Sequence, residues 1–126
     1  MQGHYVPFEW IRLTRWSVGR VAVIGDAAHA LPPNIGQGGG CAMMNGLSLA
    51  VFLDRFDDVP AALAAWERHE RPITDHTQLV SWLLGLPTTW PPALRRLFFS
   101  LAGRSKWVVA QRTRTAHHRP TGTHGA

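Results

Sequence analysis

The first quarter of the chain carries two apolar patterns that predict β-strands. Within Phe8–Trp16, Ile11 and Leu13 alternate with polar residues, which is typical of a strand with one packed and one wetter face. After a short break at residues 17–19, Arg20–Ile24 is a continuous apolar run, the pattern of a parallel strand covered on both faces. We therefore expect two strands before residue 25.

The rest of the pattern predicts helices. The first begins at residues 38–41 and ends near Phe56, and an acidic cap at Asp57–Asp58 with Pro60 in the first turn marks the start of the second. A short third helix covers Ala93–Leu101, and residues after Gln111 show no folded pattern. One broad apolar face of the second helix comprises Leu63, Trp66, Ile73, Leu79, Val80, Leu83 and Leu84.

Composition places the chain among small globular domains. Its 126 residues are 45% hydrophobic and 17% charged, which excludes disordered and fibrous classes. The single cysteine, Cys41, excludes an internal disulfide and is consistent with a reducing compartment. Because no apolar run approaches the ~18 residues of a transmembrane helix and residues 1–7 lack signal-peptide order, we expect a cytoplasmic protein without a membrane partner.

Charge is unevenly distributed along the chain. Residues 1–75 hold six basic and eight acidic side chains, whereas residues 76–126 hold seven basic and no acidic ones. A basic stretch can bind an anionic surface, but these seven residues are dispersed, so we expect a solvated tail and no specific nucleic-acid partner. They are Arg95, Arg96, Arg104, Lys106, Arg112, Arg114 and Arg119.

The segment Gly25–Gly40 is the part of the sequence that indicates chemistry. An apolar run ends at a Gly-Asp turn, a rigid Pro-Pro loop follows, and five of the sixteen residues are glycine. The Asp26 carboxylate can accept hydrogen bonds from a polyol or ribose chain at the end of a strand. Bare N–H groups at a glycine-rich helix start favour negative charge on a ligand.

The sequence GDAAHALPPNIGQGGGCAMMNG (residues 25–46) resembles the second flavin-binding signature of the class A FAD-dependent aromatic hydroxylases, which include para-hydroxybenzoate and salicylate hydroxylases. The flanking patterns W-x-x-G-R-V at 16–21 and A-L-x-x-W-E-R-H-E-R-P at 62–72 are similar to that family too. The resemblance covers about Trp10 to Leu84. It implies an α/β fold, the C-terminal part of a Rossmann-like FAD-binding domain with one or two strands followed by a helix bundle-like region, incomplete as a fold.

Site roles follow from the resemblance residue by residue. It implies that Asp26 hydrogen-bonds the ribityl chain of FAD, and that Pro32 and Pro33 line the isoalloxazine ring. The backbone of the next turn and the helix start approach the ring and its N1–C2=O edge. The implied cofactor-binding set is Gly25, Asp26, Pro32, Pro33, Gly36, Gln37, Gly38, Gly39 and Gly40. No catalytic side chain is expected. His69 and His76 lie seven residues apart without a visible further ligand, so no metal site is expected either.

The resemblance also implies an activity, in which NAD(P)H reduces FAD and O2 supplies the oxygen that hydroxylates an aromatic or related small molecule. Two departures stand against it: Asn45-Gly46 replaces a more usual acidic residue and alanine, and no G-x-G-x-x-G segment occurs in the 126 residues. A truncated non-catalytic fragment, or a basic binding module that keeps a flavin-site remnant, is therefore the alternative.

The expected division of the chain has four parts. Residues 1–17 end a substrate-domain sheet, and 18–58 form the strand, loop and helix of the FAD motif. Residues 59–110 form C-terminal helices, and 111–126 a disordered basic tail.

Overall fold

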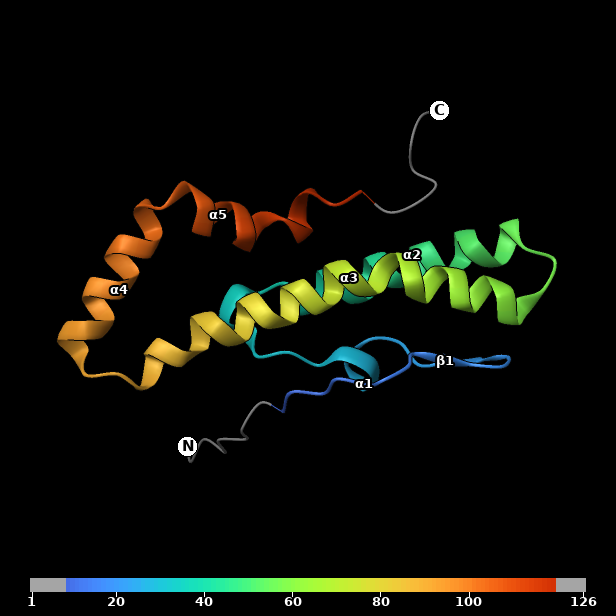
Figure 1. Cartoon of the computed structure of the whole chain (residues 1–126), viewed down its shortest axis with the longest axis horizontal. Helices are drawn as coiled ribbons and strands as arrows, with labels where there is room; N and C mark the ends of the chain where they lie inside the picture. Colours follow the sequence, from blue (N-terminus) through green and yellow to red (C-terminus); the bar gives the residue numbers. More distant parts are fainter. Residues whose placement is uncertain (1–8, 120–126) are drawn as a thin grey trace, which may run out of the picture.

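Two long helices packed side by side form the centre of this computed structural model, which describes residues 9–119. Figure 1 shows α2 and α3 joined by a tight turn, with the N-terminal segment below α3 and α5 above it. The elements are β1 (Ser17–Val18), β2 (Val21–Ala22), α1 (Asp26–His29), the 3-10 turn η1 (Pro33–Ile35), α2 (Gly38–Arg55), α3 (Val59–Gly85), η2 (Leu86–Thr89), α4 (Pro92–Arg104), α5 (Lys106–Thr113) and η3 (Thr115–His117).

Local signals explain where the two long helices begin and end. The Asp58 carboxylate accepts a hydrogen bond of 3.0 Å from the Ala61 N–H and so caps α3, as the sequence predicts. The helix predicted from residues 38–41 to about Phe56 is confirmed as α2. Helix α3 continues through Pro72, which lies inside it.

The core is small and contains many polar side chains. Trp16, Ala28 and Trp66 form its buried apolar cluster, with Leu49 and Phe52 of α2 packed against it. The buried residues of α2 are Cys41, Asn45 and Ser48, and those of α3 include Glu70, Thr74, Thr77, Gln78 and Ser81. The α2–α3 interface is therefore polar along much of its length, and its side chains need hydrogen-bond partners.

The prediction of a buried parallel strand at Arg20–Ile24 is wrong. Residues Val21–Ala22 pair antiparallel with Ser17–Val18, and the chain reverses at Gly19, where φ is +56°. Val18 and Val21 are 68% and 67% exposed. A two-residue reversal leads straight back to the preceding segment, so the apolar run pairs with its neighbour in sequence.

The segment predicted as a strand before this hairpin is not one either, in the part that the structure describes. Residues 9–16 form no strand, although Ile11 and Leu13 are half-buried and the residues between and after them exposed, as the alternation predicts. Their N–H groups donate to the carbonyl oxygens of Ala30 and Ala28, respectively. The segment is thus extended against α1. The broader expectation, a few strands followed by helices as part of an FAD-binding domain, holds.

The C-terminal segment departs from the predicted disordered tail. Residues 111–113 complete α5, and Thr115 in η3 is buried, with its hydroxyl hydrogen-bonded to that of Thr77. His76 contacts the Gln111 carbonyl oxygen at 3.3 Å. Residues 111–119 therefore pack on α3, while the rest of the predicted tail, 120–126, lies outside the described residues.

Among residues 9–119, no helix combines the length and apolar character needed to cross a bilayer.

Candidate functional site

The glycine-rich segment singled out in the sequence forms one continuous loop and helix start. Gly25 and Gly36 both adopt positive φ, +64° and +67°, which only glycine tolerates without strain. A Cβ at Gly25 would lie 4.0 Å from the Ala42 Cβ, so the turn before α1 rests against the first turns of α2. The Pro-Pro loop and η1 connect these two places.

Helix α2 begins with an open face. No side chain caps it, and its first residues, Gly38–Gly40, have neither a Cβ nor an acidic neighbour in the first turn. A Cβ built on Gly39 or Gly40 would meet no atom within 4 Å. Packing inside the described chain therefore does not require glycine there. The uncapped N–H groups and bare backbone fit a flat ligand that carries partial negative charge.

Asp26 is exposed at the first position of α1. The N-cap of that helix is Gly25, and no side chain caps it, so Asp26 is not a capping residue. Its carboxylate is free to accept a hydrogen bond from a ligand.

Helix α3 holds the loop between α1 and α2 in place. The Gln78 amide donates to the carbonyl oxygens of Ile11 at 2.7 Å and Ala30 at 2.9 Å. The Ser81 hydroxyl donates to the Pro32 carbonyl oxygen, and the Asn34 amide donates to the Ser81 carbonyl oxygen at 2.8 Å. Both sides of the Pro-Pro loop are thus fixed to one helix.

Sequence reasoning missed these loop-holding residues. Thr74, Gln78 and Ser81 recur every three to four positions and so share one face of α3, next to the predicted apolar face. A polar stripe of this spacing was the available signal. Leu79 and Leu83, predicted to pack, are instead 48% and 45% exposed.

His29 lies inside the protein and not at the open face. Its ring is 1% exposed and lies 5.2 Å from the Trp16 ring, and its Nε2 is 3.0 Å from the Asn45 amide nitrogen. The same amide donates to the Thr74 hydroxyl at 3.2 Å. Burial lowers the pKa of His29, which favours the neutral ring that accepts from Asn45. Asn45, which stands where an acidic residue is more usual, is thus part of a buried hydrogen-bond network.

The Gln37 side chain points to the C-terminal helix. Its amide donates to the Arg112 carbonyl oxygen of α5 at 2.6 Å. The side-chain nitrogen of Gln37 is therefore engaged within the chain, and its Oε1 atom is buried without a partner among the described residues.

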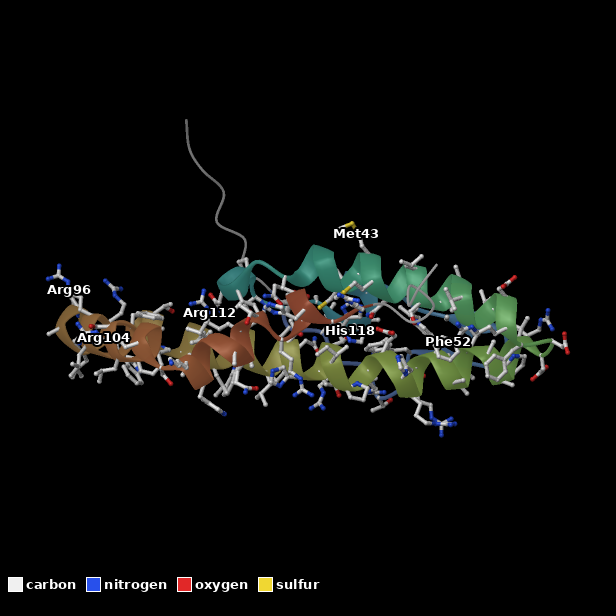
Figure 2. All side chains as sticks on the ribbon, turned by 90° about the horizontal axis from the view of Figure 1, so that it is seen from above. Met43, Phe52, Arg96, Arg104, Arg112 and His118 are labelled. Carbon is white, nitrogen blue, oxygen red and sulfur yellow. The ribbon has the colours of Figure 1, made fainter. Side chains whose placement is uncertain are left out.

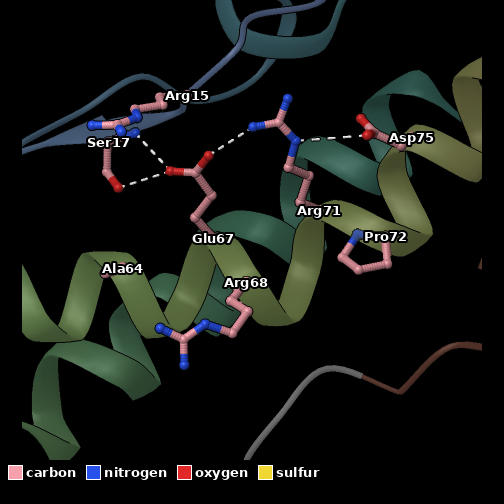
Figure 3. A pocket seen from close by; sticks show the side chains of 8 residues that line it. All are labelled: Arg15, Ser17, Ala64, Glu67, Arg68, Arg71, Pro72 and Asp75. Carbon is pink, nitrogen blue, oxygen red and sulfur yellow. Dashed lines mark hydrogen bonds and ion pairs between the residues drawn. The ribbon is translucent and has the colours of Figure 1, made fainter.

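A separate hollow of about 520 Å³ lies beside the first half of α3, and Figure 3 shows its lining. Glu67 accepts hydrogen bonds from the Ser17 N–H at 3.0 Å, the Ser17 hydroxyl at 2.9 Å and Arg71 at 2.8 Å. Arg71 also donates to the carbonyl oxygen of Thr14 at 2.6 Å. Desolvation alone would raise the pKa of Glu67, but these hydrogen bonds together lower it. Glu67, Arg71 and Ser17 therefore attach the hairpin to α3, whereas Arg15 and Arg68, which also line the hollow, have no ion-pair partner among the described residues.

Comparison with known proteins identifies a family for more than half of the chain. The FAD binding domain family matches residues 5–71. The chain is 46% identical over 115 residues to a putative 2-heptyl-3-hydroxy-4(1H)-quinolone synthase of Rhodococcus erythropolis, covering 91% of this chain and 30% of that protein. It is 57% identical over 53 residues to an FAD-dependent urate hydroxylase of Mycolicibacterium vanbaalenii, covering 41% and 13%.

Solved structures show the same likeness. A variant of 2-methyl-3-hydroxypyridine-5-carboxylic acid oxygenase superposes with a TM-score of 0.69 at 37% identity, covering 86% of this chain and 26% of that one. The chain thus spans about 30% of the length of its curated relatives. Because more than half of its residues match the family, the chain belongs to the FAD binding domain family of the FAD-dependent monooxygenases.

Proposed function

We propose that this chain forms the ring-binding part of an FAD-dependent monooxygenase that uses NAD(P)H and O2 to hydroxylate a small aromatic molecule. The observation that carries the proposal is the open, uncapped glycine start of α2, placed beside a Pro-Pro loop that α3 holds rigid. FAD, when bound, supplies the redox and oxygen chemistry. The chain itself supplies position and charge.

The residues present fit that cofactor. The Asp26 carboxylate accepts a hydrogen bond from a ribityl hydroxyl, because it is exposed and has no capping role. The N–H groups of Gly39 and Gly40 at the uncapped helix start would hold the ring, because a helix N-terminus stabilises negative charge. The remaining contacts come from backbone and ring atoms of Gly25, Pro32, Pro33, Gly36, Gln37 and Gly38. None of these groups needs to act as an acid, base or nucleophile.

A nitrogen-containing aromatic ring is the substrate class that we infer. The quinolone synthase, the urate hydroxylase and the hydroxypyridine carboxylic acid oxygenase named above all have names that denote such rings. A reaction that consumes NAD(P)H supports a cytoplasmic location. The arginines of α4 and α5 are dispersed, which favours a protein without a specific nucleic-acid partner.

A segment exchange tests the proposal. The matching 115 residues of the Rhodococcus relative are replaced by those of this chain, and bound flavin and NAD(P)H-dependent O2 uptake are measured. We expect a yellow protein whose O2 uptake rises when a quinolone is added. A folded exchange protein that retains no flavin overturns the proposal and leaves the non-catalytic fragment as the better description.

Asp26 provides the residue-level test in the same exchange protein. Asp26→Ala removes a charged acceptor, and we expect FAD affinity to fall about ten- to a hundred-fold, from roughly 1.5–3 kcal/mol per charged hydrogen bond. Asp26→Asn is the matched control, and it should lose less because the amide oxygen still accepts. Equal losses of apo-protein stability and FAD affinity in Asp26→Ala would mean that the residue supports the turn and not the cofactor.

A further inference from the structure

Three potential metal ligands meet where α2, α3 and the C-terminal segment come together. His69 and Glu70 are consecutive residues of α3, and His118 follows η3 almost fifty residues later. Seen from above in Figure 2, His118 lies over the pair formed by α2 and α3. One ligand atom from each of His69, Glu70 and His118 lies within 4.8 Å of the other two.

Glu70 is the unusual member of this cluster. Its side chain is 0% exposed, and within residues 9–119 neither carboxylate oxygen has a hydrogen-bond partner. The His118 Nε2 atom, also enclosed, lacks a partner in the same part of the chain. An ionised carboxylate in such a place is strongly destabilising unless a cation or several donors contact it.

The two imidazoles are close to Glu70 but not bonded to it. The His118 Nε2 atom is 3.6 Å from Glu70 Oε2, and the His69 Nε2 atom is 3.8 Å from Glu70 Oε1. Both separations exceed an ordinary hydrogen bond of about 2.7–3.2 Å. Each separation runs to a different oxygen of Glu70, and each is a few tenths of an ångström longer than the distance between two ligands of one tetrahedral zinc ion, which is about 3.3 Å for bonds of about 2.0–2.1 Å.

We propose that His69, Glu70 and His118 bind one Zn²⁺ ion. Two imidazole nitrogens and one carboxylate oxygen are a donor set that zinc prefers, and Mg²⁺ prefers oxygen ligands only. His69 is 47% exposed, so the fourth position faces solvent and takes water. The Phe52 ring, 5.7 Å from that of His69, packs against the exposed ligand and limits its motion.

The site has a structural consequence. Zinc bound there would fasten the segment after α5 to the middle of α3, close to the Thr77–Thr115 contact. Because metal binding requires the folded arrangement, zinc should raise the thermal stability of the chain. None of the three ligands belongs to the proposed flavin contacts, so the site stands independently of the monooxygenase proposal.

The test uses the whole 126-residue chain, purified without a histidine tag and treated with a chelator. Zn²⁺ is titrated by calorimetry, with Mg²⁺ as the comparison ion, and melting temperature is measured with and without zinc. We expect one zinc per chain, a raised melting temperature and no response to Mg²⁺. Failure to bind one zinc, or an equal response to Mg²⁺, overturns the proposal.

Two histidine variants locate the site. His118→Ala should weaken zinc binding at least about tenfold and remove the thermal shift. His117→Ala is the matched control, because that ring is directed to the Thr113 carbonyl oxygen at 2.8 Å and should leave zinc binding unchanged. Equal effects of the two variants contradict the site. Glu70→Gln should also abolish binding, but its burial makes it the less certain variant to fold, so the conclusion depends on His118→Ala.

Discussion

Gln78→Leu tests whether α3 holds the Pro-Pro loop through hydrogen bonds. The substitution keeps a side chain of similar size at a position that is 1% exposed, but it removes the two donors that reach Ile11 and Ala30. The loop before α2 would then lose its link to α3 on the α1 side, while the Ser81 contact with Pro32 remains.

The size of the loss of unfolding free energy depends on which hydrogen-bond donors each carbonyl oxygen retains. The Ile11 oxygen loses the only donor seen in the described residues, which costs about 1–3 kcal/mol for a partly buried acceptor left unpaired. The Ala30 oxygen still accepts from the Ile11 N–H at 3.2 Å, so its loss is nearer 0.5–1.5 kcal/mol. Leucine also removes the Gln78 carbonyl oxygen, which is buried without a partner, and this returns about 1 kcal/mol. The expected net destabilisation is about 0.5–3.5 kcal/mol.

Urea unfolding and amide hydrogen exchange measure this effect. The free energy of unfolding should fall by the stated amount, and the Ile11 N–H should exchange faster because its acceptor is loosened. Gln111→Leu makes the same chemical change at a half-buried residue of α5 and should stay within about 0.5 kcal/mol of the wild type. If Gln78→Leu is as stable as the wild type, or if the two variants lose the same stability, the loop does not depend on these hydrogen bonds.

Three further expectations concern charge, the C-terminal segment and the cofactor. Hydrogen bonds lower the pKa of Glu67, so its carboxylate adds stability above pH 4.5, the ordinary value, and this stability is lost as pH falls through the folded pKa. The loss of unfolding free energy in Glu67→Gln, measured in urea, should therefore be largest at neutral pH and shrink below pH 4.5. A loss that does not change with pH would contradict this expectation. Truncation after residue 110 should lower the melting temperature, because it removes buried Thr115 and the carbonyl group that Gln37 contacts. Removal of residues 120–126 alone is the comparison. Equal melting temperatures of the two truncated chains would mean that residues 111–119 add no stability by packing on α3. The 126-residue chain alone should bind FAD weakly, since the proposed contacts reach only the ring and the ribityl chain and no G-x-G-x-x-G segment occurs in these residues. Submicromolar binding in equilibrium dialysis would disprove this.

Some features of this protein could be predicted from short stretches of sequence. Asp58 and Pro60 mark the start of α3 because capping involves only neighbouring residues. The positive φ at Gly25 and Gly36 needs glycine for a steric reason internal to each residue. The order of turn, Pro-Pro loop and glycine helix start was therefore enough to identify the FAD binding domain family.

Other features depend on contacts between distant residues, which leave no local pattern. The Arg20–Ile24 run reads as a buried strand in isolation, yet its Val21–Ala22 part pairs with its neighbour across a tight turn, and Val21 and Ile24 remain exposed. The apolar face predicted for α3 does not indicate that Gln78 donates a hydrogen bond to the Ala30 carbonyl oxygen, 48 residues away. A glutamine at helical spacing reads the same whether it faces water or a buried acceptor, and only the packed chain decides which.

The C-terminal segment shows this division most clearly. Dispersed arginines and the lack of periodicity predict a solvated tail, because a sequence pattern shows how polar a segment is but not which distant residues it contacts. Packing brings Thr115 onto Thr77 and His118 beside Glu70, and each pair joins residues about forty or more positions apart. The sequence by itself determined the helix starts, the glycine loop and the family. The tertiary structure decided which polar residues of α3 contact that loop and which ones contact residues 115–118, because these contacts depend on long-range packing.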